Sequence, residues 1–406
     1  MRDDPAATLD PALRRVLLLL GLATTIIVAT EFIVTGLLPV LAADLGISLP
    51  KAGHLAGIFA LSAAIFGLPL TLVAPRFAPS HLLAGILLLF AAGNVLAVLS
   101  PTYPIFLAVR ALQGAALPAF ISVGTAAAIS LSPVNRRGKI LALANVGFIL
   151  GLIVAMPAGV ALAEGGEWST SFIALAVLSI AAAIVMAWAF PDTTRSEPLS
   201  LPDQAALLLR LPFLGHLLLS IAAFAAMFAS YTYLAAWLEG PAGFGTAEIA
   251  LTLTFFGAVG LIGNMIVAAY ADRAPITCTL SSLGVASAAA VGASVTIGQI
   301  FPFLLMLGIW GAAHTAVVTA CQVRVTLAGG EAPAFAIAMN IASANLGIAL
   351  GAVVGGFVVD FWGLEAIGWG AAGLALVAVT LAVSTRLLAK PALAKAAGQV
   401  TGRPSQ

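Results

Sequence analysis

The sequence predicts an all-α integral membrane protein with twelve transmembrane helices in two pseudo-symmetric six-helix bundles and both termini in the cytoplasm. Three observations lead to this prediction. Apolar residues make up 62% of the 406 residues and charged residues 8%, against about 25% charged in soluble domains. The apolar residues form repeated runs close to the ~20 residues that a spanning helix needs. Basic residues gather in alternate loops.

The apolar runs define the expected spans. In chain order they cover 16–43, 52–73, 80–100, 104–131, 139–163, 169–190, 212–238, 247–271, 275–298, 301–325, 333–359 and 364–388. Pro and Gly occur inside several runs, which membrane helices tolerate because neighbouring helices and water satisfy the freed backbone groups.

The two halves of the sequence resemble each other at an offset of about 197 residues. Gly114-Ala115-Ala116 recurs as Gly311-Ala312-Ala313, and Gly151 and Gly159 correspond to Gly347 and Gly355. The repeat predicts an N-terminal bundle over 1–190, a cytoplasmic linker over 191–210, a C-terminal bundle over 211–390 and a cytoplasmic tail over 391–406. Two halves with one orientation are typical of transporters whose substrate site lies at mid-membrane between the repeats.

Orientation follows from the charged loops. The basic residues on one side are Arg14, Arg15, Arg76, Arg136, Arg137, Lys139, Arg195, Arg210, Arg273, Arg324, Arg386, Lys390 and Lys395. The opposite loops carry Lys51 as their only basic residue, beside several acidic residues. Because basic loops stay inside, both termini are expected in the cytoplasm of a multi-pass protein of the cell inner (plasma) membrane. The Ala- and Gly-rich composition points to a bacterial source.

Several function classes are disfavoured by what the sequence lacks. A net charge of +1 without a basic run argues against a nucleic-acid partner. Gly138-Lys139 is followed by Ile140, so a phosphate loop is absent and ATP is not the expected energy source. No cluster has metal-ligand or catalytic spacing, so neither an enzyme nor a cofactor is expected. Cys278 and Cys321 are expected to be reduced thiols, and a monomer suffices for the architecture.

Glu31 is the acidic residue that lies within a long apolar run, the first one. A carboxylate at bilayer depth costs at least ~2.5 kcal/mol, so such residues usually face a wet path and are functional. With no metal motif nearby, the simplest function of this carboxyl group is to bind and release a proton.

Arg110, in the fourth run, lies at a similar depth to Glu31 by the helical rise of about 1.5 Å per residue. Two alternatives stand for the pair: a permanent ion pair that locks two helices, or an attraction that operates in one conformation and loads and unloads a proton. Burial disfavours the charged form of a carboxyl group, and a nearby guanidinium favours it. A motion that changes either effect would therefore load and unload a proton. His314, in the tenth run, either contributes to proton coupling and substrate binding or is a hydrogen-bonded packing residue.

Other embedded polar and aromatic residues are candidates for a substrate pocket, although hydrogen bonding between helices is the alternative for each amide. The candidates are Phe32, Thr35, Gln113, Asn145, Tyr231, Trp310, His314, Gln322, Asn340 and Asn345. Trp237, near the end of a run, is expected to anchor its helix at the interface.

Small residues at four-residue spacing, Gly147 and Gly151 in the first half and Gly347, Gly351 and Gly355 in the second, predict close helix contacts that can slide. Pro157 is expected to bend the fifth span.

These residues together resemble the major facilitator superfamily over nearly the whole chain. Arg110-Ala111-Leu112-Gln113-Gly114 resembles its fourth-helix motif, whose Arg is associated with proton coupling. The segment from Gly147 to Gly159, with Gly151 and Pro157, resembles the fifth-helix motif of antiporters, although Pro comes later than in that motif. Asp272-Arg273 resembles the loop motif that gates the cytoplasmic side, and its degraded first-half copy ends at Arg76.

The chain is most similar to the drug:proton antiporter group with twelve spans, in its sugar-efflux and arabinose-efflux-like branch. The similarity rests on Thr30-Glu31-Phe32, Gly36-Leu37-Leu38-Pro39, Tyr231-Thr232-Tyr233, Gly263-Asn264, Asn340-Ile341 and Asn345-Leu346-Gly347.

The resemblance implies proton-driven antiport, by alternating access, of a small organic solute such as a sugar, nucleoside or antibiotic. The expected partners are that solute, protons and the lipid bilayer. The alternatives are a proton symporter or uniporter that imports a metabolite, and a non-transporting membrane sensor.

Overall fold

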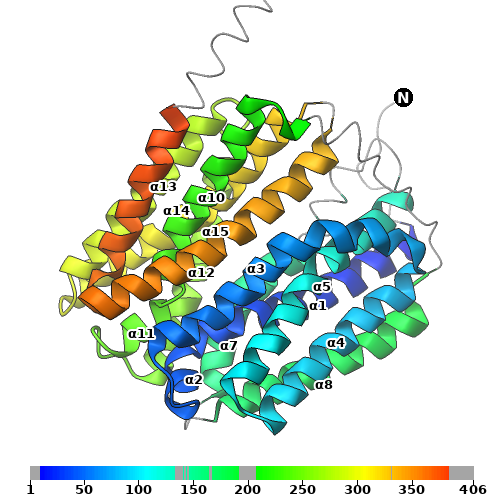
Figure 1. Ribbon diagram of the computed structural model, residues 1–406, viewed down its shortest axis with the longest axis horizontal. Helices are drawn as coiled ribbons and strands as arrows, with labels where there is room; N and C mark the ends of the chain where they lie inside the picture. Colours follow the sequence, from blue (N-terminus) through cyan, green and yellow to red (C-terminus); the bar gives the residue numbers. More distant parts are fainter. Residues whose placement is uncertain are drawn as a thin grey trace, which may run out of the picture. The chain divides into compact units, whose positions relative to one another are not determined.

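The computed structural model describes residues 10–132, 140, 143, 146–163, 167–191, 207–330 and 332–383. Throughout these residues the regular elements are helices, and no strand occurs among them, so the all-α prediction is confirmed (Figure 1). The chain divides into two compact units, each described by itself below. Unit 1 comprises residues 1–199 and 245–254, and unit 2 comprises residues 200–244 and 255–406.

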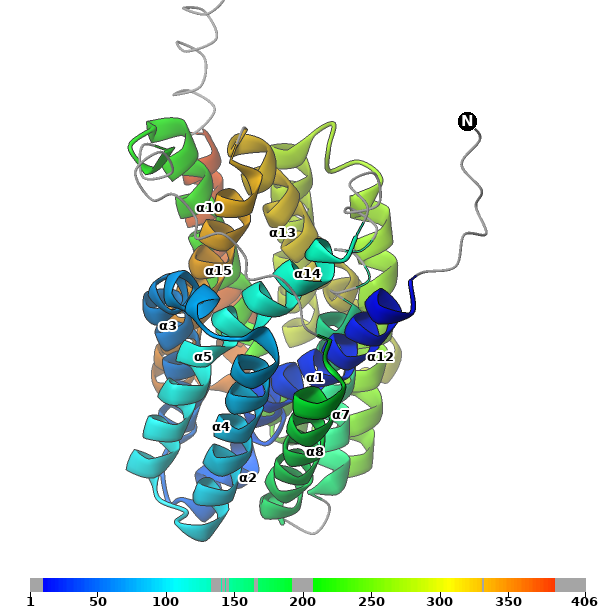
Figure 2. The same cartoon turned by 90° about the vertical axis from the view of Figure 1, so that its right-hand side faces the viewer.

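Unit 1 contains the first set of helices. They are α1 (Pro11–Gly36), α2 (Leu38–Asp44), α3 (Leu49–Val73), the short 3₁₀ helix η1 (Ala74–Arg76), α4 (Pro79–Leu99), α5 (Tyr103–Ser130), α7 (Val146–Leu162) and α8 (Trp168–Ala189). Within this unit α1 packs on α7, α3 on α5, and α4 on α8. The α4–α8 pair lies side by side in both views (Figures 1 and 2).

Unit 2 contains the second set. It comprises α10 (Leu211–Tyr231), α11 (Leu234–Glu239), most of α12 (Thr246–Ala268), α13 (Pro275–Val295), α14 (Ile300–Ala328), α15 (Pro333–Trp362) and a last apolar helix (Leu364–Val383) that opens with the 3₁₀ turn η4 (Leu364–Ala366). Here α10 packs on α15, and α13 on α14.

Eleven helices of the described residues are long and apolar enough to cross a membrane. The expected fifth span corresponds to α7, which has 17 residues, and of residues 139–145 before it the structure describes 140 and 143. The count of twelve spans and the cytoplasmic position of the termini therefore stay predictions.

Local sequence explains where many helices begin. Pro stands in the first turn of α1, α3, α4 and α5, where its missing N–H costs nothing. Asp10 caps α1 by accepting a hydrogen bond from the Ala12 N–H at 2.9 Å, and Ser48 caps α3 by accepting from Lys51 N–H at 3.4 Å.

The expected continuous spans 16–43 and 212–238 are each interrupted by a helix break. The first breaks at Leu37, between α1 and α2, and Pro39 follows it in the first turn of α2. The second breaks at Thr232 and Tyr233, between α10 and α11, without a proline. The Tyr233 hydroxyl donates to the carbonyl of Ala352 on α15 at 2.8 Å, which fixes the second break through packing.

Equivalent glycine contacts occur within each of the two units, and the equivalent residues are separated in the sequence by an almost constant offset. A Cβ at Gly151 on α7 would lie 2.9 Å from the carbonyl oxygen of Thr25 on α1, and a Cβ at Gly347 on α15 would lie 2.5 Å from that of Ile221 on α10. Both members of the second pair lie 196 residues after those of the first. The close packing predicted for these glycines is confirmed, because a Cβ would overlap the facing helix.

The same repetition holds for the second helix pair of each unit. Gly114 on α5 approaches the carbonyl of Phe59 on α3, and Gly311 on α14 approaches the carbonyl of Phe256 on α12. These partners are 197 residues apart in both helices. The internal duplication is therefore visible as repeated contacts as well as repeated letters.

Candidate functional site

Arg110 lies at the centre of a buried site in unit 1, only 1% exposed on α5. Its guanidinium donates three hydrogen bonds to backbone carbonyls. Two go to α1, from Nη1 to Thr30 O at 2.8 Å and from Nη2 to Glu31 O at 2.7 Å, and Nε donates to Leu55 O on α3 at 3.2 Å. Its Cζ also lies 4.3 Å from the ring centroid of Phe59, within cation–π range. Arg110 therefore joins three helices through their main chains.

Glu31 faces the interior of the same unit, with a residue exposure of 8%. Its carboxyl oxygen Oε2 is buried and has no hydrogen-bond partner in the part of the chain that the structure describes. Such groups are normally paired because burial without a partner costs free energy. The candidate proton carrier of the sequence thus has one carboxyl oxygen that no described residue holds by a hydrogen bond.

Among the described residues no hydrogen bond joins Arg110 to the carboxyl group of Glu31, and both alternatives for the pair stay predictions. Arg110 binds the backbone carbonyl of Glu31, and the carboxyl group of that residue is left without a bond at Oε2. The physical reason is that carbonyls from two helices converge on the guanidinium fork and accept hydrogen bonds from three of its five N–H donors. The two residues do lie together, as their estimated depths predicted.

His314 lies in an aromatic cluster of unit 2, which we define as Phe228, Tyr231, Trp237, Phe256, Phe303, Trp310 and His314. Ring centroids lie 4.5 Å from His314 to Tyr231, 5.6 Å to Phe228 and 5.7 Å to Phe256. The Nδ1 atom of His314 is buried without a hydrogen-bond partner among the described residues. The structure thus departs from the hydrogen-bonded packing alternative at this nitrogen.

Trp237 belongs to the aromatic cluster and is not an interfacial anchor, which corrects the sequence expectation. It is 0% exposed, and its ring centroid lies 5.4 Å from Phe303 and 6.2 Å from Trp310. Because the helix breaks before α11, the Trp237 side chain lies inside unit 2. Its indole Nε1 is another buried donor without a partner among the described residues.

Some polar atoms of the embedded amide side chains form hydrogen bonds, several of them between helices, and others have no partner among the described residues. Gln113 donates from Nε2 to Phe90 O at 3.3 Å and to Asn94 Oδ1 at 3.1 Å, which joins α5 to α4. This favours the interhelical alternative for Gln113, although its Oε1 has no partner among the described residues. Asn340 accepts from the Ser220 hydroxyl at 3.0 Å. Asn345 donates to Ile341 O at 3.0 Å, while its Oδ1 is buried and, within the described chain, unpartnered.

The other predicted pocket residues fall in different environments. Phe32 and Thr35 are buried near the end of α1, at 5% and 3% exposure. Gln322 on α14 is exposed, so its side chain is not part of the buried interior of unit 2. Asn145 lies outside the described residues.

The predicted gating residues lie at helix ends and at a helix contact. Arg76 is exposed at the end of η1, and Asp272 and Arg273 are exposed in the turn after α12. Gly151 packs against α1, where an added Cβ would lie 2.7 Å from Val28 Cβ. Pro157 lies inside α7, which continues to Leu162, and the bend expected there stays a prediction.

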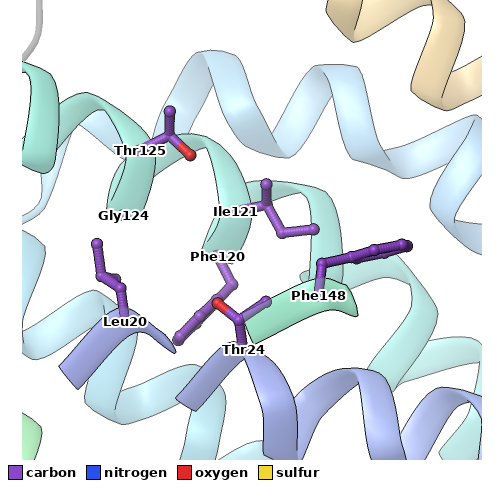
Figure 3. Close-up of a pocket in the computed structure, with 7 residues that line it drawn as sticks. All are labelled: Leu20, Thr24, Phe120, Ile121, Gly124, Thr125 and Phe148. Atoms are coloured by element: carbon purple, nitrogen blue, oxygen red, sulfur yellow. The ribbon is translucent and has the colours of Figure 1, made fainter. Parts of the chain in front are cut away.

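A small pocket of unit 1 lies apart from these residues (Figure 3). Leu20 and Thr24 point into it from α1, and Phe148 lines it from α7. The remaining lining residues, all from α5, are Phe120, Ile121, Gly124 and Thr125. Its volume of about 20 Å³ has room for about one water molecule, so it is too small for an organic solute.

Arg324 is a buried cation that sequence reasoning assigned to a cytoplasmic loop. It lies inside α14 at 1% exposure, which corrects that assignment. The charge is tolerated because polar groups of α10 and α13 surround it. The apolar run continues past Arg324 for only a few residues, so the sequence carried no signal that distinguished it from a loop residue. Cys278 and Cys321, elsewhere in unit 2, are free and buried.

Comparison with known proteins places the chain in a family. The family model of the Major Facilitator Superfamily matches residues 20–331. The chain is 29% identical over 344 residues to the inner membrane transport protein YdhP of Escherichia coli K12, covering 85% of this chain and 88% of that protein. It is 30% identical over 356 residues to a chloramphenicol resistance protein of Streptomyces lividans, covering 83% and 87%.

A solved structure agrees in fold. A bacterial homologue of the human lysosomal transporter Spinster, in an inward-facing and occupied conformation, superposes with a TM-score of 0.78 at 15% identity, covering 94% of this chain and 98% of that one. With its apolar helices and bacterial relatives, the chain is a multi-pass protein of the inner membrane. It belongs to the major facilitator superfamily of transporters.

Proposed function

We propose that the chain exports a small organic solute in exchange for protons, by alternating access, and that Glu31 carries the proton. The observation that supports this most directly is the buried carboxyl oxygen of Glu31, which has no hydrogen-bond partner among the described residues. A structural carboxylate at this depth would be expected to hold a fixed donor, whereas a proton carrier must be able to exchange its proton.

Arg110 supports the same proposal by its placement. Its guanidinium is held by carbonyls of α1 and α3, so the positive charge stays beside the Glu31 peptide whichever state the carboxyl group is in. A fixed cation next to a proton carrier lowers the free energy of the deprotonated state. Movement of the Glu31 side chain toward or away from that charge would then bind or release the proton.

The aromatic cluster of unit 2 is the proposed recognition surface for the solute. It combines aromatic faces with two polar atoms, His314 Nδ1 and Trp237 Nε1, that have no hydrogen-bond partner among the described residues. Apolar walls with a few polar atoms are typical of small-molecule sites. The arrangement suits an uncharged solute that carries a ring and hydrogen-bonding groups, and the similarity to a chloramphenicol resistance protein makes chloramphenicol the first solute to test.

The proposal includes the orientation expected from the charged loops, with both termini in the cytoplasm. The proton gradient then supplies the energy without a cofactor, and a single chain is the proposed transporting unit. Import by symport or uniport is the competing function.

The test uses everted membrane vesicles that contain the full chain, an imposed pH gradient and labelled chloramphenicol. We expect Glu31→Gln to abolish accumulation driven by the gradient while solute counterflow without a gradient persists. Glu239→Gln, which changes an exposed acid at the end of α11, is the matched control and should behave as the wild type. Gradient-driven accumulation by Glu31→Gln would refute the proton assignment. Accumulation of the solute with the opposite gradient would favour import.

A further inference from the structure

Arg324 is the centre of a second buried polar network, wholly within unit 2. Its Nη2 donates to the Ser220 hydroxyl at 2.7 Å, its Nη1 donates to the carbonyl of His216 at 2.8 Å, and its Nε donates to Thr279 Oγ1 at 3.3 Å. Ser220 in turn donates to Asn340 Oδ1 at 3.0 Å. The network therefore ties α14 to α10, α13 and α15.

Arg324 and Arg110 have the same relation to their own units. Each lies on the fourth long helix of its unit, each is 1% exposed, and each donates to the main chain of the first long helix, α10 or α1. Within the described chain, no carboxylate forms a hydrogen bond with either one. The two arginines differ in their position along the helix, because Arg110 is near the start of α5 and Arg324 is near the end of α14.

His216 adds a protonation constraint to this network. Its Nδ1 lies 3.1 Å from Arg324 Nη1. A guanidinium can only donate hydrogen bonds, so Nδ1 must be the acceptor. The imidazole is therefore neutral in this arrangement and carries its hydrogen on Nε2. A proton added at Nδ1 would remove the acceptor and place a second cation beside the guanidinium.

The helices packed against His216 supply few other charges. On α13 the titratable residue is Cys278, and on α15 it is Asp360, close to the opposite end of that helix. On α14 the titratable or charged residues are Arg324, Cys321 and His314, the last of these ten residues from Arg324. On α10 the other titratable residue is Tyr231, at the far end of the helix, and Arg210 lies just before its start. Arg324 is thus the charged group that contacts the imidazole.

We propose that Arg324 is a positioning residue of transport that holds the first half of α10 in unit 2, and that it does so fully only while His216 is neutral. When Nδ1 gains a proton from solution, Nη1 keeps the carbonyl of His216 but loses the imidazole, and repulsion between the two cations loosens the contact. The first turns of α10 become freer, while Ser220 and Asn340 still connect α10 to α15. This role of Arg324 is separate from the proposed role of Glu31. Of the two measurements below, the second rests on the proposed transport function and the first does not.

The first measurement needs no substrate. We would record ¹⁵N spectra of the full-length protein labelled at histidine, and identify His216 by its absence from His216→Asn. The expected result at neutral pH is an Nε2–H tautomer with Nδ1 accepting a hydrogen bond, and this signature should change in Arg324→Gln. A charged His216 at neutral pH, or a spectrum indifferent to Arg324→Gln, would overturn the proposal. Arg324→Met, which has no donor for Nδ1, replaces Arg324→Gln if the latter fails to fold.

The second measurement is chloramphenicol counterflow as the pH on each side of the vesicle membrane is varied separately. We carry it out in a Glu31→Gln background, so that titration of Glu31 cannot contribute. As the pH at the end where α10 begins is lowered and Nδ1 gains its proton, the rate should fall by about tenfold, the effect of one lost hydrogen bond to a charged group. His216→Asn offers an amide oxygen as acceptor and does not titrate. In this variant the fall of the counterflow rate at low pH, the acid limb of the profile, should therefore disappear.

Each result has one interpretation. An unchanged acid limb in His216→Asn refutes the role of His216, whatever Glu31→Gln does. If Glu31→Gln still couples to the gradient, the proposed proton carrier is wrong, and the histidine spectra still decide the second proposal. If chloramphenicol is not carried, the spectra decide it alone.

Discussion

The backbone of Gly114 lies directly against that of Phe59, so that a Cβ at residue 114 would stand 2.0 Å from the Phe59 carbonyl oxygen. No side chain can yield here, because both partners are main chain. We expect Gly114→Ala to push α5 from α3 and to cost about 1–3 kcal/mol, the usual range for overpacking. The thermal unfolding midpoint in detergent would measure it.

Gly85→Ala is the matched control for that substitution. A Cβ at Gly85, on α4, meets no atom within 4 Å, so the midpoint should stay unchanged or rise slightly, because Ala favours helix. Equal losses for the two variants would show that the close approach does not limit stability.

Arg110 offers a test of how a buried cation that donates to main-chain carbonyls contributes to stability. The carbonyls of Thr30 and Glu31 lie within α1, where helical N–H groups four residues on also bind them. Arg110→Met should therefore leave no unpaired acceptor and change stability by less than about 1 kcal/mol. Arg110→Lys keeps a buried charge without the donor fork and should be the less stable variant. Thermal unfolding of both proteins gives the order, and the reverse order would contradict this account.

Trp168 fastens α8 to α2 at one end of unit 1. Its Nε1 donates to Asp44 Oδ2 at 2.7 Å, and its ring contacts Phe106 and Phe172 edge-on. Because Asp44 is exposed, we expect Trp168→Phe to cost about 1 kcal/mol, measured by thermal unfolding. Trp188→Phe changes a tryptophan that is 89% exposed and should have no effect on the midpoint.

His314→Phe separates ring packing from polar recognition in the aromatic cluster. The new ring can keep the contacts with Tyr231 and Phe256, while the unpartnered Nδ1 is lost. We expect an unchanged thermal midpoint and a KM for chloramphenicol counterflow raised by about tenfold, as for one lost hydrogen bond. His81→Phe, at an exposed position in α4, is the control. An unchanged KM in His314→Phe would place solute recognition elsewhere.

Features carried by local sequence were predicted well. The long helices follow from apolar runs, and the close helix pairs follow from glycine spacing, as at Gly347 and Gly351. The helix breaks were not predicted. Pro39 gave a local sign of the first break, but the second is fixed by a bond between Tyr233 and Ala352, 119 residues apart, and such a contact leaves no pattern around either residue.

The sequence predicted which residues of the candidate site are buried, but it did not predict which hydrogen bonds they form. Glu31, Arg110 and His314 are buried as expected, because charged and titratable residues inside apolar runs are conspicuous. Arg110 binds main-chain carbonyls, and every residue type offers a carbonyl, so no sequence motif can reveal that choice. Arg324 was misplaced for another reason: it lies near the end of its apolar run, and the hydroxyls that accept from it belong to two other helices.

The repeated glycine contacts relate residues of the two units at offsets of 196 and 197, so side chains can be compared place by place. The counterparts of Glu31 and Arg110 are Met227 and Leu307, both buried and apolar. Conversely, Trp310 stands where the first unit has Gln113. At these places one duplicated scaffold has thus specialised twice, with ionisable side chains in the first copy and apolar or aromatic ones in the second. Side chains swapped between equivalent places would reveal which specialisation each half can do without.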